Sequence, residues 1–82
     1  MKVEIEVKTQ KYLENLNEPH KSRIKKALAK LEKDPPEGDI TALIGKDGFR
    51  LRVGGYRVLF EIDDNVIYIY QIGLRGQIYK RK

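Results

Sequence analysis

Hydrophobic and polar residues alternate along several stretches of the sequence. Residues 2–8 show this period of two, which is typical of a strand with one buried face. Residues 49–53 and 56–62 show it again on either side of Gly54–Gly55, a pair that favours a two-residue hairpin turn. Residues 66–72 are almost wholly apolar, which indicates a central strand that is covered on both faces.

A helical spacing occupies the region between the first strand and the hairpin. Apolar residues recur three and four positions apart, at Ile24, Ala27, Leu28 and Leu31. This spacing predicts an amphipathic helix of about four turns, ended by Asp34–Pro35–Pro36. A shorter helix capped by Thr9 precedes it, and residues 40–43 are interpreted as a short extended piece. The predicted fold class is α+β, ordered β-α-α-β-β-β, with a helical pair packed on a mainly antiparallel four-stranded sheet.

Length and charge narrow the range of functions. The chain has 82 residues and is expected to form a single domain over residues 1–82, with a small core that leaves little room for a deep cofactor pocket. It carries 17 Lys and Arg against 12 Asp and Glu, a formal net charge of +5. Such a positive field favours nucleic acid or an acidic protein as the partner.

Several kinds of site are excluded by the residues that the sequence lacks. Cysteine is absent and His20 is the one histidine, which excludes disulfides, thiolate catalysis and an ordinary structural zinc site. No nucleotide-binding glycine loop or metalloprotease motif occurs, so neither a metal nor a cofactor is predicted. No apolar run approaches the roughly 18 residues of a membrane span, and the first residues lack the apolar region of a signal peptide. We therefore expect a cytoplasmic protein that does not contact a membrane.

The two-glycine hairpin turn decides which side chains share a face of the sheet. Its register places Arg52 directly opposite Arg57, with Arg50 on the same face and the apolar residues on the other. Like charges that face each other across strands destabilise a sheet, which favours an anion as the partner of these arginines. The alternative is that Arg57 pairs with Glu61 along its own strand and that the other arginines are solvated surface.

Two further groups of residues allow two interpretations each. Lys80–Arg81–Lys82 is either a frayed basic tail or a segment that steers the protein electrostatically towards a polyanion. Tyr68 and Tyr70 lie in the apolar stretch and are interpreted as packing residues rather than as platforms on which bases stack.

Two segments in the second half of the chain carry a resemblance to a known family. They are residues 51–62 (LRVGGYRVLFEI) and residues 72–79 (IGLRGQIY). Together with the strand–helix–helix start, they resemble the RelE toxins of type II toxin–antitoxin modules, in the RelE/ParE superfamily. The sequence departs from the family pattern at two positions. Gly48 lies where a lysine is expected, and Leu74 replaces the histidine of many relatives.

The resemblance implies a metal-independent endoribonuclease that enters the ribosomal A site and cuts the mRNA codon presented there. The 2′-hydroxyl attacks the adjacent phosphate, which leaves a cyclic phosphate and a new 5′-hydroxyl. By position, four residues match the functional residues of the family: Arg57, Arg75, Tyr79 and Arg50. RNA contacts are implied for four other basic residues: Lys46, Arg52, Lys80 and Arg81.

Roles for the matched residues follow from the chemistry of phosphate cleavage. Arg57 and Arg75 would bind the scissile phosphate and stabilise the charge that develops on it. Tyr79 would act as the general base or stack on a base of the RNA. Arg50 would support the phosphate or donate a proton.

The resemblance also allows two other functions. The first is a ParE-like inhibitor of DNA gyrase, and the second is a catalytically inactive domain that only binds an antitoxin. In every case the resemblance and the positive charge imply a cognate acidic antitoxin that wraps the surface of the toxin. The nuclease would in addition bind the ribosome and mRNA.

Overall fold

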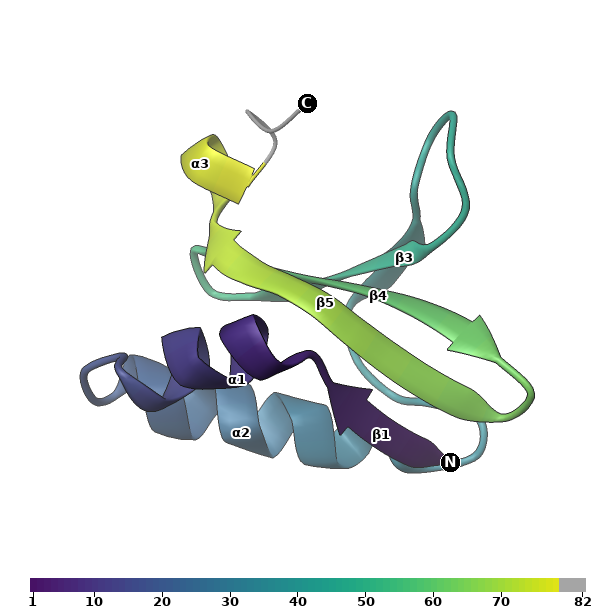
Figure 1. Cartoon of the computed structure of the whole chain (residues 1–82), viewed down its shortest axis with the longest axis horizontal. Coiled ribbons are helices and arrows are strands. Elements are labelled where there is room, and N and C mark those ends of the chain that lie inside the picture. Colours follow the sequence, from purple (N-terminus) through teal and green to yellow (C-terminus); the bar gives the residue numbers. More distant parts are fainter. Residues whose placement is uncertain (79–82) are drawn as a thin grey trace.

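The computed structural model describes residues 1–78 as a twisted sheet with two long helices packed against one side (Figure 1). In chain order the elements are β1 (Lys2–Ile5), α1 (Val7–Glu14), α2 (His20–Lys30), β2 (Ile40–Ala42), β3 (Phe49–Val53), β4 (Tyr56–Asp63), β5 (Val66–Leu74) and α3 (Arg75–Ile78). No helix within residues 1–78 is both long enough and apolar enough to cross a membrane.

The strands form one five-stranded sheet in the order β1-β5-β4-β3-β2. β1 runs parallel to β5, and the other neighbouring strands are antiparallel. α1 and α2 lie next to each other on one side of the sheet, and β5 runs between β1 and β4 (Figure 1). The predicted α+β class, with a helical pair on a mainly antiparallel sheet, is confirmed.

The number of strands differs from the prediction, because residues 40–42 form a fifth strand at the edge of the sheet. In this antiparallel pair, Ile40 lies opposite Leu51 and Ala42 lies opposite Phe49. Three residues are too few to show a period of two in the sequence. The strand therefore depends on β3, which offers backbone hydrogen-bonding groups along its edge.

The first helix begins earlier than predicted. α1 starts at Val7, and Glu6 caps it: Glu6 Oε1 accepts hydrogen bonds from the backbone N–H of Thr9 (3.2 Å) and from Thr9 Oγ1 (2.8 Å). The predicted cap at Thr9 is therefore wrong, since Thr9 lies inside the first turn and is buried. A carboxylate at this end also complements the positive end of the helix dipole.

The core lies between the two long helices and the inner side of the sheet. Its fully buried side chains come from both layers: Leu13, Ile24, Leu31, Leu51, Val58, Phe60, Ile67 and Ile69. Phe49 and Phe60 stack across neighbouring strands with their ring centroids 5.5 Å apart. Arg52 lies opposite Arg57, so the hairpin register predicted from the two-glycine turn is confirmed.

β5 is an internal strand, as its apolar sequence predicts, but only one of its sides is covered by helices. Ile67 and Ile69 are buried against the helices, whereas Tyr68, between them, keeps 42% of its surface exposed. The expectation that both faces are covered is therefore wrong for Tyr68. An aromatic side chain in an apolar run can lie on an open face, because its ring still packs on neighbours while its hydroxyl contacts water.

Candidate functional site

Three arginines lie on the side of the sheet that faces away from α1 and α2. β3 contributes Arg50 and Arg52, and β4 contributes Arg57, directly opposite Arg52. Alternate residues of these strands point into the core, which leaves the residues between them on the outer side. Arg50 lies opposite Leu59. These four residues define the arginine face.

Arg57 is the most buried of the three arginines, with 7% of its surface exposed. Its Nη1 donates hydrogen bonds to the backbone carbonyls of Tyr56 (3.1 Å) and Gly54 (3.4 Å). A guanidinium stays charged even when it is buried, so these carbonyls hold a positive charge against the hairpin turn. Gly73, which faces Arg57 from β5, has no side chain to cover it. The charge of Arg57 is thus fixed in position by the fold.

The same turn holds the beginning of α3. The backbone N–H of Arg75 donates to the carbonyl of Gly55 (3.2 Å), the residue after the one that Arg57 contacts. Gly54 has φ +60°, the left-handed conformation that a tight two-residue turn requires. The structure therefore brings Arg57 and the exposed Arg75 to one turn, although they are far apart in the sequence.

An acidic residue lies beside the like-charged pair. Asp39, just before β2, has its Oδ2 3.6 Å from Nε of Arg52, and both side chains are more than half exposed. An exposed ion pair of this kind contributes at most about 1 kcal/mol to stability. The alternative pair of Arg57 with Glu61 is disfavoured by distance, because four residues along a strand span roughly 13 Å. Asp39 is thus a weak, exposed partner for one of the two facing arginines.

A pocket opens between the sheet and the loop that joins β2 to β3. It has a volume of about 320 Å³ and is lined by Thr41, Ala42, Leu43, Ile44, Lys46, Arg50 and Leu59. This cavity is termed the loop pocket. Leu59 is 5% exposed, whereas Ile44 is 98% exposed. Arg50 Nε is buried and has no hydrogen-bond partner among the described residues.

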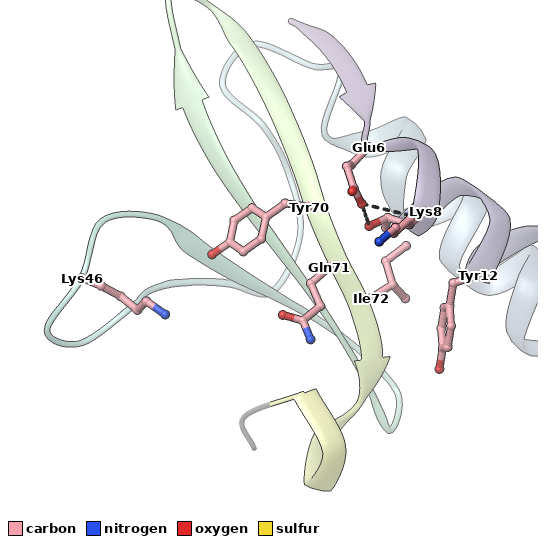
Figure 2. Close-up of a pocket in the computed structure, with 8 residues that line it drawn as sticks. Glu6, Lys8, Tyr12, Lys46, Tyr70, Gln71 and Ile72 are labelled. Carbon is pink, nitrogen blue, oxygen red and sulfur yellow. Dashed lines mark hydrogen bonds between the residues drawn. The ribbon is translucent and has the colours of Figure 1, made fainter. Parts of the chain in front are cut away.

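The β2–β3 loop also explains the glycine that stands where a lysine was expected. Gly48 has φ +117°, and a Cβ there would lie 3.2 Å from the carbonyl oxygen of Phe60 and 3.3 Å from Leu43 Cδ1. Both features disfavour lysine at this position. Lys46 lies in the same loop and extends towards β5 (Figure 2).

A β-bulge in β5 adds an aromatic residue to this region. Leu59 pairs with Gln71 and Phe60 with Ile69, so Tyr70 is the extra residue of the ladder. Figure 2 shows Tyr70 extending from β5 towards the loop that carries Lys46. A period of two cannot reveal this placement, because a bulge interrupts the alternation at the residue concerned.

A second pocket of about 520 Å³ runs along β5. Tyr70, Gln71 and Lys46 line it, and Lys8 and Tyr12 of α1 lie on the other side of the strand (Figure 2). Burial raises the pKa of Tyr12 above its ordinary value of 10.0, and the neighbouring Tyr56 raises it further. The Tyr12 hydroxyl therefore stays protonated at neutral pH, where it can donate a hydrogen bond but cannot act as a general base.

The predicted site residues fall into three groups. Arg57 and Arg75 are both attached to the hairpin turn, with Arg52 beside them. Arg50 and Lys46 line the loop pocket. Three predicted residues lie outside the described part of the chain: Tyr79, Lys80 and Arg81. Within residues 1–78, no three His, Asp or Glu side chains gather as metal ligands would.

Comparisons with known proteins place this chain in a family. A sequence model of the family described as ParE toxin of type II toxin–antitoxin system, parDE, matches residues 3–79. No curated protein matches the sequence. A chain in the archaeal RelE–RelB complex from Pyrococcus horikoshii OT3 is 32% identical, over 93% of this chain and 96% of that chain, with a TM-score of 0.77.

Two more distant structures share the fold. A chain in the RelB–RelE antitoxin–toxin complex from Methanococcus jannaschii is 23% identical, over 92% of this chain and 93% of that chain, with a TM-score of 0.76. The isolated RelE toxin of E. coli is 21% identical, over 95% of this chain and 89% of that chain, with a TM-score of 0.70. The chain, by its match over residues 3–79 and its identity with the Pyrococcus protein, belongs to the RelE/ParE family of toxins from type II toxin–antitoxin systems.

Proposed function

We propose that this toxin cleaves mRNA in the ribosomal A site and that Arg57 and Arg75 bind the scissile phosphate. The observation that carries the proposal is the hairpin turn, whose consecutive carbonyls accept hydrogen bonds from the Arg57 side chain and the Arg75 backbone. The turn thereby anchors both residues beside the further positive charge of Arg52. Fixed positive charges stabilise the extra negative charge that phosphorus carries in the transition state of RNA cleavage.

The reaction needs attack, charge stabilisation and two proton transfers. The 2′-oxygen bonds to phosphorus, the bond from phosphorus to the 5′-oxygen breaks, and a cyclic phosphate and a 5′-hydroxyl result. We assign charge stabilisation to Arg57 and Arg75, with Arg50 supporting the phosphate or donating the proton to the leaving oxygen. Tyr79 would remove the proton or stack on a base, and the ribosome would hold the RNA in line for attack. The proposed phosphate site uses no metal.

The same charged surface supports a proposal about partners. The net charge of +5 favours an acidic binding partner, and two of the similar structures are complexes of a RelE with a RelB. We expect a cognate acidic antitoxin of the RelB kind to cover the arginine face and to compete there with RNA. The toxin would act in the cytoplasm, where mRNA and ribosomes meet.

A second candidate function is inhibition of DNA gyrase. The matching family model is described as a ParE toxin, and this chain lacks the lysine and the histidine expected at Gly48 and Leu74. The backbone at Gly48 disfavours any side chain, so the absence of lysine there follows from the conformation of this loop. The same observation favours the third candidate, a domain that binds an antitoxin without catalysis.

Primer extension on a reporter mRNA, with and without ribosomes stalled at a defined codon, tests the nuclease. We expect cuts inside the A-site codon only when ribosomes are present, and loss of at least a hundredfold in rate for Arg57→Ala and Arg75→Ala, or about 2.7 kcal/mol. Lys33→Ala, which changes an exposed lysine near the end of α2, is the matched control and should cut normally.

Three results would contradict the proposal in different ways. Rates within about threefold of wild type for both arginine variants, under 1 kcal/mol, would remove their assignment. Cleavage without ribosomes would keep the nuclease and remove the A site. Intact mRNA in every lane, together with loss of supercoiling in a gyrase assay, would establish the second candidate. Intact mRNA, normal gyrase and no growth arrest on induction would leave the antitoxin-binding domain.

A further inference from the structure

We propose that the loop pocket binds one unstacked nucleobase of a single-stranded RNA whose phosphate lies on the arginine face. The inference rests on the proposed function for the identity of the RNA. The assignment of a nucleobase as the bound group rests on the size and lining of the pocket. The pocket has a volume of about 320 Å³, at the lower end of the range for small-ligand sites in proteins.

The walls of the pocket suit the apolar faces of a base. Leu59 is almost fully buried, and Ala42, Leu43 and Ile44 add further apolar surface from the loop side. Ile44 is the most exposed large apolar residue of the described chain, because 98% of its surface faces water. Covering an exposed isoleucine with a ligand lowers the free energy, and a base that enters the pocket would lie against it.

The polar groups of the pocket suit the edge of a base. Arg50 Nε is buried without a hydrogen-bond partner among the described residues, which is costly for a donor. Bases carry ring nitrogens or carbonyl oxygens that accept such a bond, and a guanidinium plane is a surface on which an unpaired base stacks. Thr41 adds a hydroxyl and Lys46 a second cation to the lining.

The position of the pocket connects it to the phosphate site. Arg50 lies two residues before Arg52 on β3, which is roughly 7 Å along the strand. Arg52 in turn lies opposite Arg57. A nucleotide whose phosphate contacts this arginine pair can therefore reach the loop pocket with its base. The pocket would then distinguish which base of the codon lies beside the scissile bond.

An aliphatic side chain of the antitoxin is the competing occupant. It would cover Ile44 and Leu59, but it offers no acceptor to Arg50 Nε and no charge to Lys46. A base linked to a phosphate satisfies both the apolar walls and the donors. The nucleobase is therefore the occupant that the chemistry of the pocket favours.

Fluorescence anisotropy with a short labelled RNA tests the inference without cleavage. The RNA carries 2′-O-methyl groups, so it cannot be cut, and a series of oligonucleotides replaces one base at a time by an abasic site. We expect one position at which loss of the base weakens binding by about tenfold, in the range measured for stacked bases. Ile44→Ser should weaken binding of the intact RNA by a similar factor and leave binding of that abasic RNA unchanged.

Two further variants separate the pocket from general surface effects. Ile62→Ser changes an exposed isoleucine at the far end of β4, outside the loop pocket, and should leave all affinities unchanged. Thr41→Val retains the shape of the pocket and removes one hydroxyl, so it should change the ranking of the four bases at the sensitive position. Both residues are exposed, so neither substitution threatens the fold.

Three outcomes would overturn the inference. They are no detectable binding of the intact RNA, no position sensitive to loss of its base, and an equal effect of Ile44→Ser on intact and abasic RNA. Binding of an antitoxin peptide that needs Ile44, with RNA binding that does not, would assign the pocket to the antitoxin. Base-dependent binding without ribosomal cleavage would keep the pocket and reject the nuclease. Cleavage without base-dependent binding would keep the nuclease and reject the pocket.

Discussion

The two sides of the sheet differ sharply, although the same strands build both. On the covered side, Val58 and Phe60 of β4 are fully buried beneath the helices. On the open side, away from α1 and α2, β4 presents Arg57 and Leu59, which are still largely buried, and β3 presents two arginines that are more exposed. Because side chains alternate along a strand, one register determines both the packing of the core and the spacing of the charges. Stability and the proposed phosphate chemistry are therefore set by the same hairpin.

The largest predicted difference between the sides is in packing. Phe60→Ala should lower the free energy of unfolding by about 3–5 kcal/mol, because it leaves a cavity under the helices and removes the ring stacked on Phe49. Tyr68→Ala, on the open side of the neighbouring strand, should cost less than about 1 kcal/mol. Urea unfolding followed by far-UV circular dichroism measures both. Equal losses would mean that the open side also contributes packing energy.

A smaller effect separates the two facing arginines. Arg57→Ala should lower the free energy of unfolding by about 1–3 kcal/mol, because it removes the donor to the carbonyls of Gly54 and Tyr56. Arg52→Ala removes an exposed pair with Asp39 and also the repulsion from Arg57, so its net effect should stay within about 0.5 kcal/mol.

The same unfolding measurement tests this pair of variants, and an Arg52→Lys variant serves as the control that retains the charge. A loss at Arg52 as large as the loss at Arg57 would show that Asp39 stabilises the hairpin more than an exposed ion pair does. That result would weaken the view that the arginine face is held for an anion. It would favour a structural role for the arginines instead.

The smallest predicted effect concerns the carboxylate of Glu18, which lies just before α2. The pKa of Glu18 lies below its ordinary value of 4.5, because its carboxylate accepts hydrogen bonds from the side chain and the backbone N–H of Ser22. The folded protein therefore holds this proton less tightly than the unfolded chain. The resulting stabilisation is present above the ordinary pKa and is lost as the pH falls through the lowered one.

Substitution of the serine tests this local interaction. Ser22→Ala should raise the pKa of Glu18 towards its ordinary value, and Ser22→Thr, which keeps the hydroxyl, should leave it low. A titration of the Glu18 carboxyl carbon by NMR reads the pKa directly. An unchanged value in Ser22→Ala would mean that the backbone hydrogen bond and the nearby charges of Lys21 and Lys25 lower it without the serine hydroxyl.

The β3–β4 hairpin could be predicted from the sequence because its information is local. Alternation on both sides of a two-glycine turn specifies the pairing of Arg52 with Arg57, and the structure confirms it. The same applies to the amphipathic pattern of the second helix, whose Ile24 and Leu28 are buried as its spacing predicts. Both features can be predicted from residues that lie close together in the sequence.

The features that could not be predicted depend on distant parts of the chain. The carbonyl of Gly55 meets Arg75 only after β5 has joined the sheet, and Asp39 reaches Arg52 only because β2 pairs with β3. The bulge at Tyr70 is likewise a property of two paired strands. At the start of α1 the residue preference for N-caps favours Thr9, but the helix begins at Val7 and the Glu6 side chain caps it, so residue type alone does not locate this end.

The place of β5 in the sheet has a consequence for how a cell makes this toxin. Within residues 1–78, β5 is the last strand of the sheet along the chain, yet it lies between β1 and β4, so it joins the first strand to the hairpin. During synthesis the earlier segments leave the ribosome first, and the sheet stays split until residues 66–74 follow. Arg75 reaches the Gly55 carbonyl later still. The arginines of the proposed phosphate site are therefore not brought together on the nascent chain until residues 66–75 have been made.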